Sequence, residues 1–112
     1  MNILRKSRED MNKKDLYFLV TSPEIKKMKE LSGTTVKLLD WVMFNSVDRE
    51  TGDLYKVLSI KTDNGVYATN SATMIESFEQ IVECFENDFS AINIFEGHSN
   101  RGRNFLMCSY AE

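Results

Sequence analysis

The chain has 112 residues, a length that suits one domain with a single hydrophobic core. Its hydrophobic content of 42% and charged content of 28% are typical of a soluble globular domain. No apolar run approaches the roughly 20 residues of a membrane-spanning helix, and the N-terminus lacks the apolar core of a signal peptide, so we expect a cytoplasmic protein. The formal net charge of −3 argues against indiscriminate duplex binding through a cationic surface.

The charge is distributed unevenly along the chain. Residues 1–61 carry 12 basic and 9 acidic side chains, whereas residues 62–112 carry 2 basic and 8 acidic ones. The two cations of the acidic part are Arg101 and Arg103, which flank a glycine in the segment "HSNRGRNF". A turn requires Gly and Asn but no arginine, so these two side chains are candidates for a binding role.

The N-terminal part has no clear periodicity. Residues 1–15 are polar and charged, and we expect a flexible extension in which either Met1 or Met11 is the natural start. The remainder, residues 16–112, is expected to form the single domain. The apolar run "LYFLVTS" at its start is compatible with a strand or with a segment lying on the core.

The segment "SPEIKKMKELSG", residues 22–33, predicts a short helix. Ser22 is a suitable N-cap, Pro23 suits the first helical position, and Gly33 is a natural terminator. The apolar residues of the segment recur at intervals of three.

Residues 35–47 are rich in β-branched and aromatic side chains and predict one long strand, coiled or bulged near Asp40. The segment "DRETGD" predicts a turn, and residues 54–62 alternate as a strand does. "DNG" predicts a tight hairpin turn, followed by a returning strand over residues 66–70.

The apolar period then changes to that of an amphipathic helix over residues 71–88, where Thr73 and Glu76 form a potential capping box. Two more strands are predicted over residues 91–97 and 103–111, joined by a turn. Five strands with a helix between the third and fourth, and an additional N-terminal helix, predict a mainly β protein with two helices, built as a five-stranded OB-fold barrel. The long first strand favours this fold, because a small barrel closes when one strand bends through both sheets.

Catalysis is poorly supported. The chain has a single His, and its two cysteines, Cys84 and Cys108, have no zinc-type spacing and suit the core of a protein in a reducing compartment. No Gly-rich phosphate loop is present. We therefore expect no enzyme, no cofactor and no metal site.

Binding of single strands is better supported, because it needs aromatic faces for base stacking and cations along the backbone path. The strand alternation assigns the apolar residues of one parity to the core. These residues are Leu58, Ile60, Val66, Ala68, Ile92, Ile94, Leu106 and Cys108. The opposite parity then carries Phe95 and several of the candidate binding residues. The full candidate set is Lys37, Trp41, Tyr55, Lys61, Tyr67, Arg101, Arg103 and Phe105.

The segments "YATNS" and "SNRGRNF" carry a resemblance to a known family. With these segments in view, the chain resembles small single-stranded DNA-binding proteins of phages, prophages and related mobile elements of Gram-positive bacteria. The resemblance covers roughly residues 34–111. The resemblance implies an OB-fold that coats single-stranded DNA during replication or recombination in a bacterial host cytoplasm, without catalysis. The chain departs from better-known bacterial single-strand binders because it has no Gly-rich tail or acidic tip. Recruitment of replication enzymes is therefore in doubt, and a monomer and a homodimer both stay open.

Two other functions are alternatives to single-strand binding. The domain could be a protein-interaction module that docks a partner through the acidic helix face of Glu79, Glu83 and Glu86, or an acidic inhibitor that mimics nucleic acid. Both alternatives predict no binding to oligo-dT.

Overall fold

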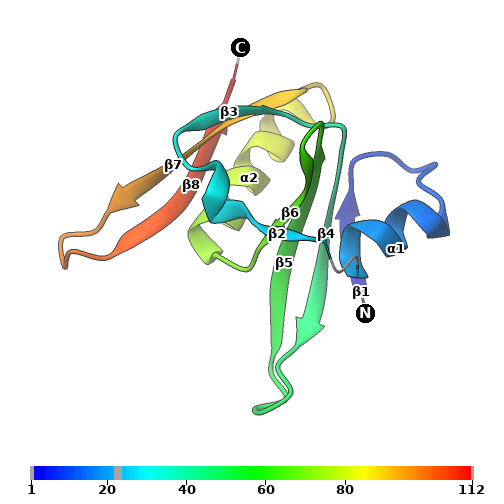
Figure 1. Ribbon diagram of the computed structural model, residues 1–112, viewed down its shortest axis with the longest axis horizontal. Helices are drawn as coiled ribbons and strands as arrows, with labels where there is room; N and C mark the ends of the chain where they lie inside the picture. Colours follow the sequence, from blue (N-terminus) through cyan, green and yellow to red (C-terminus); the bar gives the residue numbers. More distant parts are fainter. Residues whose placement is uncertain (1, 22–23, 112) are drawn as a thin grey trace.

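The structure, a computed structural model, describes residues 2–21 and 24–111. Within them the chain forms two β-sheets, two α-helices and one short 3₁₀ helix (Figure 1). All strand pairs are antiparallel except that of Lys26–Lys27 with Gly65–Thr69, which is parallel. The five-stranded sheet has the order β1-β4-β5-β6-β2 and the three-stranded sheet the order β3-β7-β8. The strands are β1 (Asn2–Lys6), β2 (Lys26–Lys27), β3 (Thr34–Lys37), β4 (Asp40–Val47), β5 (Leu54–Thr62), β6 (Gly65–Thr69), β7 (Ala91–His98) and β8 (Asn104–Tyr110). The helices are α1 (Lys13–Thr21), α2 (Ala72–Phe85) and the 3₁₀ helix η1 (Met28–Leu31).

The predicted closed OB-fold barrel is wrong, because both sheets are open. The predicted long strand ends at Lys37 and restarts at Asp40, and its two halves join different sheets. β3 pairs with β7, while β4 pairs with β1 and β5. Among the described residues no ladder joins the outer strands of one sheet to those of the other, and a barrel requires such a closure.

The helix order also differs from the prediction. The apolar run "LYFLVTS" lies largely in α1, where Leu16, Leu19 and Val20 follow the helical spacing and pack on the five-stranded sheet. The predicted helix over residues 22–33 is replaced by β2 and η1. A spacing of three residues between apolar side chains matches the three-residue turn of a 3₁₀ helix, and Met28 and Leu31 enter the core in this way. The predicted N-cap and first turn, at Ser22 and Pro23, lie outside the described residues.

The predicted extension contributes to the domain. β1 pairs with β4 and completes the edge of the five-stranded sheet, and α1 begins within the segment assigned to the extension. Asn12 caps α1, since its side-chain Oδ1 accepts a hydrogen bond of 2.8 Å from the backbone N–H of Asp15.

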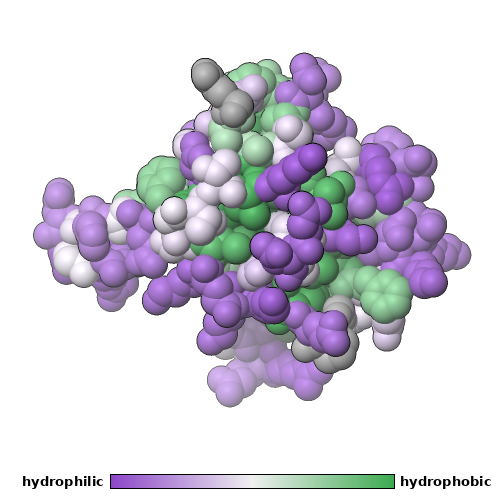
Figure 2. Space-filling view, turned by 45° about the horizontal axis from the view of Figure 1, so that its top comes forward, coloured by the Kyte–Doolittle hydropathy of each residue, from purple (hydrophilic) through white to green (hydrophobic). Residues whose placement is uncertain are grey.

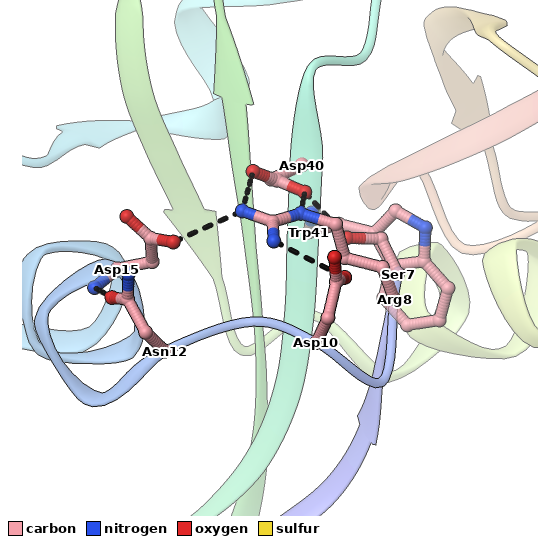
Figure 3. Close-up of polar contacts among 7 residues, drawn as sticks. All are labelled: Ser7, Arg8, Asp10, Asn12, Asp15, Asp40 and Trp41. Carbon is pink, nitrogen blue, oxygen red and sulfur yellow. Dashed lines mark hydrogen bonds and ion pairs between the residues drawn. The ribbon is translucent and has the colours of Figure 1, made fainter.

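Arg8 connects this N-terminal segment to the sheet through hydrogen bonds (Figure 3). It makes a bidentate contact with Asp40, donating from Nε to Oδ1 at 3.0 Å and from Nη2 to Oδ2 at 3.2 Å. It also donates to Asp15 and Asp10, at 3.0 and 3.3 Å. These hydrogen bonds, first those to Asp40, raise the pKa of Arg8 above its usual value. Ser7 adds a 2.9 Å hydrogen bond to the same carboxylate.

The main core lies between the two sheets, with α2 packed on one side (Figure 1). Phe78 of α2 is fully buried and meets the ring of Trp41 edge-on, at 5.0 Å between ring centroids. The predicted core residues Leu58, Ile60, Ile92, Ile94, Leu106 and Cys108 are all buried here, as expected. A second, smaller cluster lies under α1 on the other face of the five-stranded sheet. Its buried members are Met11, Leu19, Val42 and Phe44.

The helix α2 has a different N-cap from the predicted one. Ser71 is the N-cap and its hydroxyl accepts from the Met74 N–H, so the capping box assigned to Thr73 and Glu76 is wrong. Thr73 instead donates to the carbonyl of Leu106 at 2.8 Å, and Ser77 accepts from the Cys108 N–H at 3.0 Å. These two hydroxyls occupy backbone groups along the free edge of β8, where a further strand would otherwise pair.

Candidate nucleic-acid interface

The eight predicted binding residues do not share one surface. Trp41 and Tyr67 are buried, with exposed fractions of 4% and 6%, and both belong to the main core. Tyr67 lies there because the hairpin turn has only two residues between the paired Thr62 and Gly65. The strand was predicted to start one residue later, with Val66 in the core. A shift of one residue moves every side chain to the opposite face.

Tyr55 and Lys61 lie on the face of β5 that carries α1. Ser59, between them on the same face, is fully buried and donates to the carbonyl of Leu19 in the helix. Tyr55 is 39% exposed near the β4–β5 turn, and Lys61 is exposed opposite Asp40. The helix therefore occupies the stretch of sheet that would have joined these two side chains into one binding surface.

Arg103, Phe105 and Phe95 lie on the outer face of the three-stranded sheet, which is the part of the predicted surface that the structure brings together. Phe105 pairs across the ladder with Gly97, and Phe95 pairs with Met107. No helix of the described residues covers this face, since α1 packs on β4 and β5 and α2 packs on the inner side of β8 (Figure 1). We call this surface, made by Phe95, Gly97, Arg103, Phe105 and Met107, the open face.

Lys37 lies on the same side of this sheet but at its far end. It pairs with Ala91 of β7, six residues from Gly97. At about 3.4 Å per residue this separation is roughly 20 Å along the strand. Polar side chains lie between the two ends of this face. One such pair is Thr35 and Asn93, in which the Thr35 hydroxyl donates to Asn93 Oδ1 at 2.6 Å. Lys37 therefore lies on the same side of the sheet as the open face but outside it.

Gly97 gives the ring of Phe105 its position. A Cβ atom built on Gly97 would lie 2.5 Å from Cε2 and 2.6 Å from Cζ of Phe105. The aromatic ring thus lies against the backbone of the neighbouring strand, in the space where a side chain would otherwise stand. The ring is half-buried and keeps part of its surface available on the open face.

The two arginines lie at the tip and the end of the β7–β8 turn. The turn is closed by hydrogen bonds from Ser99 N–H to the Arg103 carbonyl, at 2.8 Å, and from Gly102 N–H to the Ser99 carbonyl, at 3.0 Å. Gly102 has φ of +77°, a conformation that glycine adopts without strain. Within the described residues neither guanidinium group has a hydrogen bond or ion pair. Figure 2 shows this projecting hairpin, at the left, covered largely by hydrophilic side chains.

A groove of about 290 Å³ lies on the inner side of the same hairpin, between β8, η1 and the start of α2. Its lining residues are Lys29, Thr69, Ser71, Glu96, Asn104, Phe105 and Leu106. No sequence signal predicted this groove. Lys29 lies in the helix predicted over residues 22–33 and Asn104 in the last predicted strand, and neither residue type signals a groove by its spacing.

No group of three His, Cys, Asp or Glu side chains among the described residues could hold a metal ion. Burial raises the pKa of the Cys108 thiol, and a hydrogen bond with Ser77 lowers it by less. Cys84 is exposed on α2, contrary to its predicted place in the core.

The acidic face of α2 is partly engaged. Glu79 accepts from Lys56 of β5 at 3.4 Å, whereas Glu83 and Glu86 are exposed. The surface proposed for a partner protein thus contains one glutamate that already has a partner within the domain.

Comparisons of this chain with protein-family models, with curated proteins and with solved structures give no match. None of the helices in residues 2–21 and 24–111 is long and apolar enough to cross a membrane.

Proposed function

We propose that this protein binds single-stranded DNA, without catalysis, through the open face and the β7–β8 turn. The observation that carries the proposal is the juxtaposition of two aromatic side chains, Phe95 and Phe105, with Arg103 on one uncovered sheet face. Unpaired bases stack on such rings, and guanidinium groups pair with phosphates. Coating of unpaired DNA in replication or recombination of a phage or mobile element is the role that the family resemblance adds.

A single strand fits this surface better than a duplex does. Bases in a duplex are stacked on one another, so they can reach a protein ring only after they are unpaired. Duplex binding depends mainly on many phosphate contacts, and the β7–β8 hairpin offers two arginines in an acidic half of the chain. The proposal thus predicts a clear preference for unpaired strands.

The test is fluorescence anisotropy of labelled oligo-dT, beside the same sequence as a duplex and as RNA. The double variant Arg101→Ala, Arg103→Ala should bind oligo-dT markedly more weakly at low salt. Each phosphate contact on a single strand contributes about 0.7 to the slope of log K against log salt. The slope should therefore fall by about 1.4 in the double variant.

The matched control removes two cations from the opposite side of the molecule. Lys13 and Lys14 begin α1, which lies across the domain from the β7–β8 hairpin (Figure 1). The variant Lys13→Ala, Lys14→Ala has the same net charge as the arginine variant and should keep the affinity and salt slope of the unaltered protein. Equal losses in both variants, or no binding of oligo-dT by any of them, would reject the proposal.

A further inference from the structure

The groove beside β8 contains polar side chains of both charge signs that have no partner. Lys29, Glu96 and Asn104 all line it. Within the described residues none of these three side chains makes a hydrogen bond or an ion pair. An ammonium, a carboxylate and an amide together offer donors and acceptors to one ligand.

The shape and chemistry of the groove restrict the ligand. Its volume of about 290 Å³ lies at the small end of the range for ligand sites. Leu106 supplies apolar surface, which suits a flat ring. The carboxylate of Glu96 disfavours a phosphate group, because like charges repel. A neutral ring with donors and acceptors on its edge satisfies these conditions.

The groove adjoins the open face at Phe105. This residue lines the groove and also belongs to the open face. It lies in β8, an edge strand of its sheet, so a bound chain can pass round this edge without crossing another strand. Beyond Phe105, two hydroxyls of α2 occupy backbone groups of this edge: Thr73 donates to the Leu106 carbonyl, and Ser77 accepts from the Cys108 N–H.

We infer that the groove is a nucleobase pocket. One base of a single strand enters it next to a base that stacks on Phe105. Asn104 and Glu96 bind the hydrogen-bonding edge of the inserted base, in the way that amides and carboxylates distinguish base edges elsewhere. This inference rests on the proposed function and adds base preference to it.

The test compares oligo-dT, oligo-dC and oligo-dA of equal length by anisotropy. The unaltered protein should prefer one of the three by at least about fivefold, the lower end of what one base-edge contact contributes. Asn104→Ala and Glu96→Gln should each reduce this preference while retaining binding of the disfavoured homopolymers. Asn104 is exposed, so its replacement should leave the fold intact.

Two controls match these changes. Asn100→Ala removes an exposed amide from the adjacent turn, and Glu83→Gln neutralises an exposed carboxylate on α2; both should keep the base preference. Equal binding of the three homopolymers by the unaltered protein would overturn the pocket and leave the proposed function standing. A base preference that persists in both Asn104→Ala and Glu96→Gln would also overturn the pocket and leave the proposed function standing. Absence of binding to every homopolymer would overturn the proposed function itself.

Discussion

The ring of Phe105 occupies the space that a side chain at Gly97 would take, with Cε2 2.5 Å from the position of a Cβ atom on that glycine. Gly97 has no positive φ, so its backbone conformation is open to any residue. The glycine is needed here for the close approach of a ring and not for its conformational freedom. The absence of a side chain at Gly97 therefore determines where the Phe105 ring lies on the proposed stacking surface.

Replacing Gly97 by alanine should move the Phe105 ring away from the sheet. Because the ring is half-buried and can rotate outward, we expect a modest loss of stability of about 1 kcal/mol. Base stacking on one aromatic ring contributes roughly 1–3 kcal/mol, so the affinity for oligo-dT should fall about tenfold. Urea unfolding and anisotropy measure the two effects separately.

A double-mutant cycle tests whether the ring transmits this effect. In a Phe105→Leu background the alanine at position 97 meets no aromatic ring, so Gly97→Ala should then change the affinity little. Equal losses in both backgrounds would mean that Gly97 acts through another contact.

The hydroxyl of Ser77 should stabilise the free edge of β8. Ser77→Ala removes the partner of the Cys108 N–H, and an unsatisfied buried amide costs about 1–3 kcal/mol. Ser109→Ala is the control, since Ser109 is exposed and its hydroxyl accepts a 3.3 Å hydrogen bond from the Asn93 amide, its one side-chain partner among the described residues. Urea unfolding should show a clear loss for the first variant and a change within about 0.5 kcal/mol for the second.

The Arg8 cluster should hold the N-terminal segment on the sheet. Arg8→Lys keeps the charge but loses the two-pronged contact with Asp40. We expect faster amide hydrogen exchange in β1 and α1, with unchanged exchange in α2. Arg8→Gln should produce a larger effect in the same segment. Uniformly faster exchange across the domain would contradict a local role.

The buried thiol of Cys108 should make stability depend on alkaline pH. Its pKa in the folded protein lies above the ordinary value of 9.0, so the unfolded chain loses this proton first. The stabilisation is complete below pH 9.0 and is lost as the pH rises through the folded-state pKa. The stability difference between the unaltered protein and Cys108→Ala, from urea unfolding, should therefore shrink above pH 9.0. A constant difference would show that burial does not favour the neutral thiol.

The parts of the fold that follow local rules were predictable. The strand over residues 54–62 and the amphipathic helix agree with the structure, and the tight hairpin after the strand is present with a turn one residue shorter than predicted. Gly52, in the connection between β4 and β5, and Gly65, the first residue of β6, both have positive φ, as expected of glycines in or beside turns. Alternation placed Ile92, Ile94, Leu106 and Cys108 in the core correctly. In each case a short-range period or a single turn residue decides the structure.

The errors arise where tertiary contacts override local signals. β1 consists of five residues of mixed polarity, and it is a strand because β4 offers a free edge. Arg8 finds three carboxylates that are 2, 7 and 32 residues away in the chain, and no local pattern reveals the most distant one. Asn12 followed by Asp15 was a readable start signal for α1 that the sequence analysis overlooked.

The candidate site was only partly predictable, because strand parity depends on register. Trp41 was assigned to the binding surface, yet it is buried against Phe78. Its fluorescence should report unfolding rather than stacking on a base. Alternation within β8 placed Phe105 and Arg103 correctly relative to Leu106. It could not reveal that α1 covers the corresponding face of the other sheet.

The most direct test of the central claim is an NMR titration of the isotope-labelled protein with oligo-dT. The proposed binding mode predicts that the largest amide shift changes lie in β7, β8 and their turn, between residues 93 and 107. The amides of α1 and β1 should change little, because α1 packs on the outer face of the five-stranded sheet and β1 is the edge strand of that sheet, so neither belongs to the open face. Shift changes concentrated on α1, or none at saturating oligo-dT, would contradict binding at the open face.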